Sequence, residues 1–342
     1  MHFDEVRRNL VSVQLLTRLG TEHGMTPAAC LRDTGLDQAA LSHPETEITG
    51  SQELQVVRNL AAGLAHLPGI GLDAGLRYHL AAYGIWGFAL VSSPTYRSAA
   101  EVAVRYLDLS YAFVSFRIEV HGKDFVIVLD DAGIPADVRQ FLVERDFAAW
   151  VNAAREMLPG GLRVRGLQFR FPRPDYAERF ATLCGVEPRF GAPRNAIVLD
   201  LVDVEAPMPQ GNALTSRALQ EQCHRLLDRR RARSGIAGQV RDRLLHSVNR
   251  FPTIGTVASA LNLGPRSLRR RLEEEGTSYR VLTDEVRRIL AEELLTSGRL
   301  KLEEVSERLG YAEPASFTHA FKRWTGVSPA NYRKAHLEKG SS

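Results

Sequence analysis

The chain has 342 residues, of which 44% are hydrophobic and 25% are charged, and its formal net charge is +4. This composition is typical of a soluble globular protein with two or three domains, and it excludes a wholly disordered or fibrous chain. The charge is uneven, because residues 1–215 carry 20 basic and 25 acidic side chains whereas residues 216–342 carry 24 and 15, so the last third is suited to bind a polyanion.

The first hundred residues predict helices, because their apolar side chains recur close to every 3.6 positions. Three segments show this period most clearly, over residues 6–20, 53–67 and 92–109. In the last of them, Pro94 lies where a helix would begin. We therefore expect the N-terminal part of the chain to be rich in helices.

The middle of the chain changes period and predicts about four strands, over residues 112–120, 125–131, 163–171 and 196–202. The first two are separated by the turn sequence HGKD, which favours a β-hairpin. A long helix is predicted over 136–157 and a short one over 175–183. Strands with interposed helices predict an α+β domain, rich in helices.

The sequence EAPMPQGNA at residues 205–213 predicts a domain boundary, because its proline and glycine interrupt the periodicity before a helical stretch. We expect a first domain over residues 1–208, a linker over 209–234, and a second domain over 235–338.

The second domain repeats a pattern of two short helices joined by a tight turn. The turn is Asn-Leu-Gly at 262–264 in the unit over residues 253–276, and Gly310–Tyr311 in the unit over residues 301–326. Residues 279–300 form an apolar-striped helix between the two units. One such unit is also compatible with an ordinary helical hairpin. Two units with a shared connector in a basic region indicate helices that enter the roughly 12 Å wide major groove of DNA.

The sequence GYAEPASFTHAFKRWTGVSPANYRK resembles the C-terminal signature of the AraC/XylS family of bacterial transcription regulators. The similarity covers roughly residues 235–336. The matching positions are Gly310, Tyr311, Phe317, Phe321, Lys322, Gly326, Ser328, Pro329, Tyr332 and Arg333. The resemblance implies an all-α domain with two helix-turn-helix units joined by a long helix, and double-stranded DNA as its partner.

The resemblance also implies which side chains face the DNA, and the helical pattern leaves further residues exposed beside them. Together these candidates are Arg266, Ser267, Arg269, Arg270, Ala315, Ser316, His319, Lys322 and Arg323. The second recognition helix is poor in long donors, because Pro314 and Ala315 offer none. We therefore expect the first helix, through Arg269 and Arg270, to supply the stronger base contacts.

The first domain is also similar to a known one. GFALVSSPTYRSAAEVAVRYL and PRFGAPRNAIVLDLV resemble the arabinose-binding or dimerisation domain of a regulator subset that includes ornithine-utilisation and quorum or virulence regulators. The similarity covers about residues 15–208 and implies effector sensing and a homodimer. The helical first hundred residues differ from the cupin-type β-barrel of the family's founder, so the domain's name does not establish arabinose as the ligand.

The candidate effector site lies in YHLAAYGIWG, which mixes aromatic and polar groups as small-ligand pockets do. Its candidate residues are His79, Tyr83 and Trp86, together with Tyr111 and with Arg194 as a partner for an anionic effector. The alternative is structural: core packing for the aromatic residues and the histidine, and a turn cap or a pair with a local carboxylate for Arg194.

The sequence contains no motif of a known enzyme class or metal site. Cys30, Cys184 and Cys223 lie far apart and outside any zinc or disulfide spacing, so we expect buried thiols in a reducing compartment. The first ten residues lack the apolar core of a signal peptide, and no apolar run reaches the roughly 18–20 residues of a membrane helix. These observations predict a cytoplasmic protein without a cofactor, metal or membrane contact.

The sequence as a whole predicts a sequence-specific DNA-binding transcription regulator that responds to a small molecule and is not an enzyme. We expect a homodimer, with RNA polymerase as a further partner if the protein is an activator. Two alternatives stay open: a ligand-independent architectural DNA-binding protein, and an enzyme with a DNA-binding appendage, such as an alkyl-transfer repair protein with a reactive cysteine.

Overall fold

The computed structural model describes residues 7–43, 46–245, 251–296, 300–311 and 313–337, without the side chains of 231–234 and 334–337. The chain divides into two compact units, Met1–Arg229 and Arg230–Ser342. The division falls within 209–234, the stretch expected to join two domains, and most of this stretch is helix α10, Ala213–Ser234. Cys223 and Leu227 of α10 are buried in the core of the N-terminal unit.

Helices make up most of the first hundred residues, as the period predicts. They are α1 (Val11–Glu22), α2 (Pro27–Cys30), α3 (Gly50–Gly63), α4 (Ile70–Gly75), α5 (Ile85–Val91) and α6 (Tyr96–Arg105). Local side chains fix two of their starts: Thr49 and Gln52 form a capping box at α3, and Thr95 and Ser98 form one at α6. Strands β1 (Arg7–Asn9) and β2 (Glu47–Thr49) pair antiparallel beside them.

A five-stranded sheet of order β3-β4-β7-β5-β6 follows. Its strands are β3 (Ser115–His121), β4 (Asp124–Asp130), β5 (Val164–Gln168), β6 (Pro188–Arg189) and β7 (Asn195–Asp200). The predicted hairpin is confirmed, since β3 and β4 pair antiparallel from Ser115 opposite Asp130 to His121 opposite Asp124. All four predicted strands are present. Only β1, β2 and β6 were not expected, because two or three residues are too few to show a period of two.

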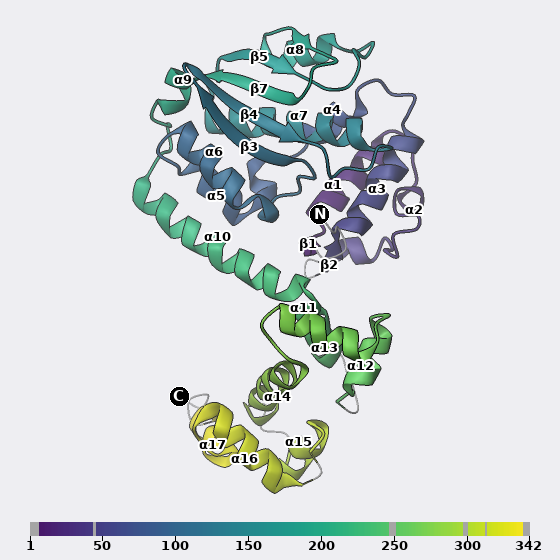
Figure 1. Ribbon diagram of the computed structural model, residues 1–342, viewed down its shortest axis with the longest axis vertical. Helices are drawn as coiled ribbons and strands as arrows, with labels where there is room; N and C mark the ends of the chain where they lie inside the picture. Colours follow the sequence, from purple (N-terminus) through teal and green to yellow (C-terminus); the bar gives the residue numbers. More distant parts are fainter. Residues whose placement is uncertain (1–6, 44–45, 246–250, 297–299, 312, 338–342) are drawn as a thin grey trace. The chain divides into compact units, whose positions relative to one another are not determined.

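Helix α7, Arg139–Met157, packs against the sheet and against α4 (Figure 1). Phe125 and Ile127 of β4 share a core with Leu142 and Phe147 of α7. Helix α4 can approach α7 closely because Gly75 has no side chain. A Cβ there would lie 2.2 Å from the backbone oxygen of Arg145. Two further helices, α8 (Glu178–Cys184) and α9 (Leu201–Glu205), complete the N-terminal unit together with α10.

The C-terminal unit consists of helices and, within its described residues, has no strand. The helices are α11 (Ile236–Leu245), α12 (Ile254–Ala260), α13 (Pro265–Glu274), α14 (Tyr279–Thr296), α15 (Leu302–Arg308), α16 (Pro314–Thr325) and α17 (Pro329–Leu337). Two small hydrophobic cores, both contacted by Phe251 and Leu290, hold it together. The predicted fold class, an α+β unit followed by an all-α unit, is confirmed, while the expected end at residue 338 lies outside the described residues. Among the described helices, none is both long and apolar enough to cross a membrane.

Candidate DNA interface and sensor cavity

The first helix-turn-helix unit consists of α12 and α13. Val257 and Ala258 of α12 pack with Leu268 and Leu272 of α13 in one buried cluster. Asn262 in the turn has a positive φ of 55°, a conformation that asparagine tolerates better than most residues. The turn sequence predicted this conformation. The turn places Leu268 and Leu272 of α13 in the core and leaves the opposite face of the helix exposed.

The outer face of α13 carries the four expected side chains, Arg266, Ser267, Arg269 and Arg270, and all of them are exposed. Arg270 lies 3.7 Å from the Glu274 carboxylate, an exposed pair that holds the side chain only weakly. Within the described residues, Arg266 and Arg269 have no ion pair. These two guanidinium groups are therefore free to donate to phosphates or to guanine edges.

The C-terminal end of α13 is anchored to α11 by one carboxylate. Glu275 accepts hydrogen bonds from the backbone N–H groups of Ile236, at 2.7 Å, and Ala237, at 3.0 Å. These N–H groups begin α11 and lack partners within the helix, and an anion at a helix N-terminus is favoured by the helix dipole. A Cβ on Gly235 would lie 2.6 Å from this carboxylate, so a larger residue there would make the Glu275 side chain shift.

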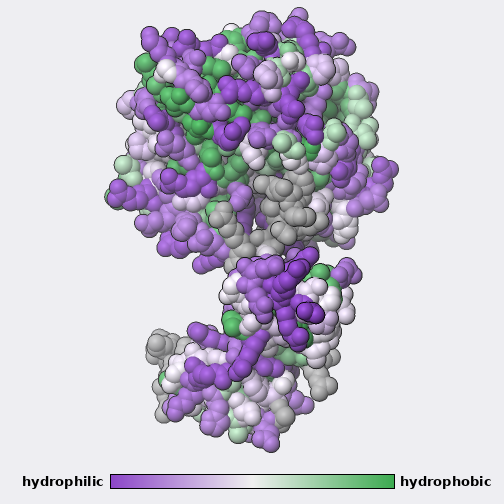
Figure 2. All heavy atoms as spheres, in the orientation of Figure 1, coloured by the Kyte–Doolittle hydropathy of each residue, from purple (hydrophilic) through white to green (hydrophobic). Residues whose placement is uncertain are grey.

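The second unit consists of α15 and α16, and its turn contains Gly310 at a φ of 75°. Phe317 and Phe321 of α16 are fully buried against α15 and α14. The expected contact residues are exposed on α16, and they are Ala315, Ser316, His319, Lys322 and Arg323. Arg323 also donates to Asp284 of α14 at 3.1 Å. Figure 2 shows hydrophilic side chains interspersed with side chains of intermediate hydropathy on the visible face of the C-terminal unit.

Helix α14 connects the two units and is tied to the second one by Arg287. The guanidinium of Arg287 lies 4.8 Å from each of the ring centres of Phe251 and Tyr311. Its Nε also donates to the backbone oxygen of Leu309 at 2.9 Å. This clamp of two rings and one hydrogen bond holds the turn of the second unit against the connector.

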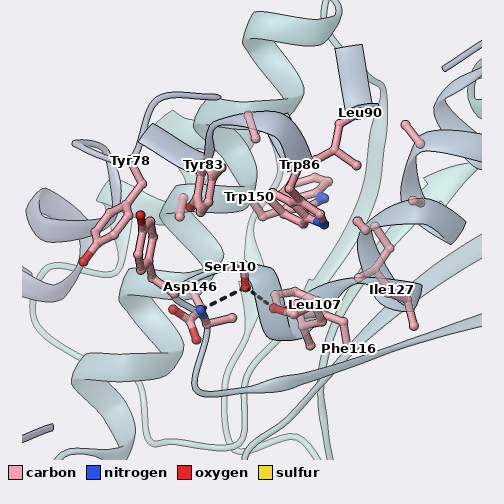
Figure 3. Close-up of a pocket in the computed structure, with 18 of the residues that line it drawn as sticks. Tyr78, Tyr83, Trp86, Leu90, Leu107, Ser110, Phe116, Ile127, Asp146 and Trp150 are labelled. Atoms are coloured by element: carbon pink, nitrogen blue, oxygen red, sulfur yellow. Dashed lines mark hydrogen bonds between the residues drawn. The ribbon is translucent and has the colours of Figure 1, made fainter. Parts of the chain in front are cut away.

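A cavity, the candidate effector site, lies in the N-terminal unit among α5, α6, α7 and the β3–β4 hairpin (Figure 3). Its volume is about 90 Å³. Three of the predicted effector residues, Tyr83, Trp86 and Tyr111, line it. The sequence reasoning missed Trp150 of α7 and the run of alanines along α6 and α7.

The polar atoms of the cavity wall are mostly paired. The Tyr111 hydroxyl donates to Asn9 Oδ1 at 2.6 Å, the Ser110 hydroxyl to the oxygen of Leu107 at 2.7 Å, and the Trp150 indole to the Tyr96 hydroxyl at 2.7 Å. Two lining groups are exceptions: among the described residues, neither the Tyr83 hydroxyl nor the Trp86 indole has a hydrogen-bond partner. Trp86 is the more buried of the two, at 7% exposure.

A buried ion network closes one side of the cavity. The Glu53 carboxylate accepts from Arg8 at 2.8 Å and lies 3.4 Å from Arg145 Nη1. Asp146 accepts from Arg145 Nε at 2.9 Å and from the backbone N–H groups of Phe113 and Val114. Two arginines and two carboxylates thus balance in charge. The sequence reasoning missed this network, because its members come from segments far apart along the chain.

His79 and Arg194 do not line the cavity. His79 is exposed and its Nδ1 lies 2.5 Å from a Glu156 oxygen. Arg194 donates to Glu119 at 2.7 Å, and this bond lowers the pKa of the Glu119 carboxyl. The arrangement of Arg194 therefore matches the structural alternative, a pair with a local carboxylate. The structure brings together three of the five predicted effector residues and places these two elsewhere.

Comparison with known families supplies the identification. Residues 24–208 match the arabinose-binding domain of AraC transcription regulators, and residues 257–335 match a helix-turn-helix domain family. The chain belongs to the AraC family of transcription regulators. An uncharacterised HTH-type regulator of Mycobacterium tuberculosis is 35% identical over 96% of this chain and 97% of its own length.

Other AraC-family relatives extend over the same length. The ornithine utilization regulator of Pseudomonas aeruginosa is 29% identical and covers 94% of this chain and 95% of its own. The crystal structure of the transcriptional regulator CdpR from the same species has a TM-score of 0.49 and 26% identity, over 95% of this chain and 98% of that one.

Proposed function

We propose that this AraC-family transcription regulator binds specific DNA sequences as a homodimer, under the control of a small molecule held in the N-terminal cavity. The observation that carries the proposal is the pair of helix-turn-helix units, each with an exposed second helix. Promoter or operator DNA is the partner, and RNA polymerase is a further one if the protein activates transcription.

We assign the recognition of base edges in the major groove mainly to α13. Its Arg266 and Arg269 have free guanidinium groups within the described residues, and an arginine can donate to both O6 and N7 of a guanine. On α16, Arg323 is shared with Asp284, and Ser316 and His319 are short. The second helix therefore positions the protein on the backbone more than it reads sequence.

A small molecule would control DNA binding by shifting the balance between two arrangements of the dimer. A small molecule that binds one arrangement of the dimer more tightly increases the population of that arrangement, and with it the affinity for a DNA site of matching spacing. The cavity supports this role because it is a concave, mostly apolar space beside a rigid ion network.

The alternative of an alkyl-transfer enzyme finds no support in the thiols. Nucleophilic cysteines need a lowered pKa, whereas burial raises the pKa of Cys184 to about 12 and that of Cys223 to about 11. Burial also raises the pKa of Cys30. In all three residues burial thus favours the protonated thiol, which is the poorer nucleophile.

Selection of binding sites from a random DNA pool tests the proposal against the architectural alternative. The full chain is used to select duplexes, and its affinity for the selected site is compared with that for a scrambled one at fixed salt. We expect a ratio of at least about 10³, the lower range for specific regulators. A ratio near one indicates an architectural protein and overturns the proposal.

A further inference from the structure

The geometry points to a specific ligand class for the N-terminal cavity: a compact, uncharged and mostly apolar molecule that presents one hydrogen-bond acceptor to the indole N–H of Trp86. This inference rests on the proposed function, in which the cavity holds the effector. It adds the chemistry of that effector.

The walls of the cavity set the apolar character of the ligand. Small residues on two helices leave the space open: Ala99 and Ala103 of α6, and Ala149 and Ala153 of α7. Because each pair is four residues apart, each pair lies on one face of its helix. Aromatic rings, with Phe116 and Ile127 of the hairpin, form the remaining walls (Figure 3). Such walls stabilise a ring or a short hydrocarbon body by burial of its surface.

The charges beside the cavity are not available to a charged ligand. Asp146 accepts four hydrogen bonds, two from Arg145 and two from backbone N–H groups. Arg145 is 1% exposed, and its other donors face the backbone oxygen of Tyr111 and the Glu53 carboxylate. A carboxylate or ammonium group in the cavity would be desolvated without an opposite charge.

A polyol is disfavoured for a related reason. Each sugar hydroxyl that is buried without a partner loses its hydrogen bonds to water. The hydroxyls of Ser110 and Tyr111 already donate within the protein, and so does the indole of Trp150. Among the described lining residues, the Tyr83 hydroxyl and the Trp86 indole are left to bind a ligand, which is fewer polar groups than an arabinose molecule has hydroxyls.

Trp86 supplies a buried polar contact. Its Nε1 is a buried donor without a partner among the described residues, in a side chain that lines the cavity. The ring is held in place, since its centre lies 4.9 Å from that of Tyr83 at an interplanar angle of 60°. The start of α5 is also fixed, because Gly87 has no Cβ and one there would lie 2.2 Å from the Leu80 oxygen. A ligand carbonyl or ether oxygen would satisfy this donor.

Four small probes and the full-length chain test the inference. Acetophenone is a neutral ring with an acceptor, ethylbenzene has a similar shape without one, benzoate is anionic, and L-arabinose is a polyol. Calorimetric titration is expected to give the tightest binding for acetophenone, weaker binding for ethylbenzene, and none for benzoate or arabinose at millimolar concentration. Tighter binding of benzoate or arabinose, or no binding of any probe, overturns the inference.

Two variants locate the site. Trp86→Phe keeps a ring but removes the donor, so acetophenone affinity is expected to fall by about 2- to 12-fold while ethylbenzene affinity is unchanged. Ala103→Leu is expected to fill the cavity and abolish both interactions. Phe88→Leu, at an exposed position of the same helix as Trp86, is the control and should leave both affinities unchanged. Equal losses of both probes in Trp86→Phe overturn the role of the indole.

DNA affinity, measured with and without acetophenone, separates this inference from the proposed function. If acetophenone binds with the expected selectivity and DNA affinity does not change, the ligand class stands and effector control fails. If DNA binding is specific but the probes lack that selectivity, the ligand class alone is overturned.

Discussion

Replacing Glu144 by glutamine is expected to stabilise the N-terminal unit at neutral pH. Glu144 lies on α7, is 2% exposed, and accepts hydrogen bonds from Gln140 at 3.0 Å and from the Tyr176 hydroxyl at 2.7 Å. Burial raises the pKa of its carboxyl from 4.5 to about 6, although these two hydrogen bonds act in the opposite direction. The folded state thus favours the protonated acid more than the unfolded state does.

The sign and size of the effect follow from linkage. A carboxyl with a raised folded-state pKa destabilises the fold above that pKa, and the cost disappears as the pH falls below the unfolded value. One decade in a protonation equilibrium corresponds to about 1.4 kcal/mol, so the cost is about 2 kcal/mol at pH 7.5 and about 0.8 kcal/mol at pH 5. Glutamine keeps an oxygen that can accept both hydrogen bonds and carries no charge.

Urea unfolding at both pH values measures this effect. With Trp324→Phe as the background, the remaining tryptophans, Trp86 and Trp150, report on the N-terminal unit alone. We expect Glu144→Gln to raise the free energy of unfolding by about 1–2 kcal/mol at pH 7.5 and by less than about 1 kcal/mol at pH 5. Glu221→Gln, at an exposed position, is the control. Destabilisation by Glu144→Gln at pH 7.5 would show that the buried charge stabilises the fold, and would refute the reasoning.

Three further outcomes are expected. Arg269→Ala or Arg270→Ala should relax the selected DNA motif at one position more than His319→Ala does. Arg217→Ala, which lies outside both helix-turn-helix units, is the charge-matched control. A motif changed only by His319→Ala contradicts this ranking. Log affinity should fall with log salt at a slope of about −4 to −7, corresponding to roughly 4–8 neutralised phosphates, and a flat dependence argues against groove docking. Glu53→Gln should destabilise the N-terminal unit by about 3–5 kcal/mol in urea unfolding, because it removes a charge that faces two buried arginines, and a loss below about 1 kcal/mol argues against the network.

Periodic and turn-forming segments were the parts of the fold that could be predicted. The β3–β4 hairpin, helix α7 and the positive φ at Asn262 all follow from local sequence. The network between Glu53 and Arg145 could not be predicted, because its members are 92 residues apart and pairing depends on the tertiary fold. For the candidate sites, exposure on α13 and α16 follows from helix periodicity, whereas the cavity depends on which faces of α6 and α7 meet.

The predicted effector residues illustrate the same limit. Tyr83 and Trp86 were recognised as aromatic residues with polar tips, and they do line the cavity. His79 lies in the same ten-residue stretch, but the turn of the chain there directs it to Glu156 at the surface. Local composition therefore located the region of the cavity without deciding which side chains face inward.

The carboxylate of Glu275 also couples the first turn of α11 to the end of α13. The chain passes from the end of α10 at Ser234 to the start of α11 at Ile236 through one residue, Gly235. A long flexible tether absorbs a displacement, but a one-residue joint has little slack. Because Glu275 follows directly after α13, a displacement of the first turn of α11 also displaces the end of α13. The start of α11 and the end of α13 are thus coupled through a single carboxylate.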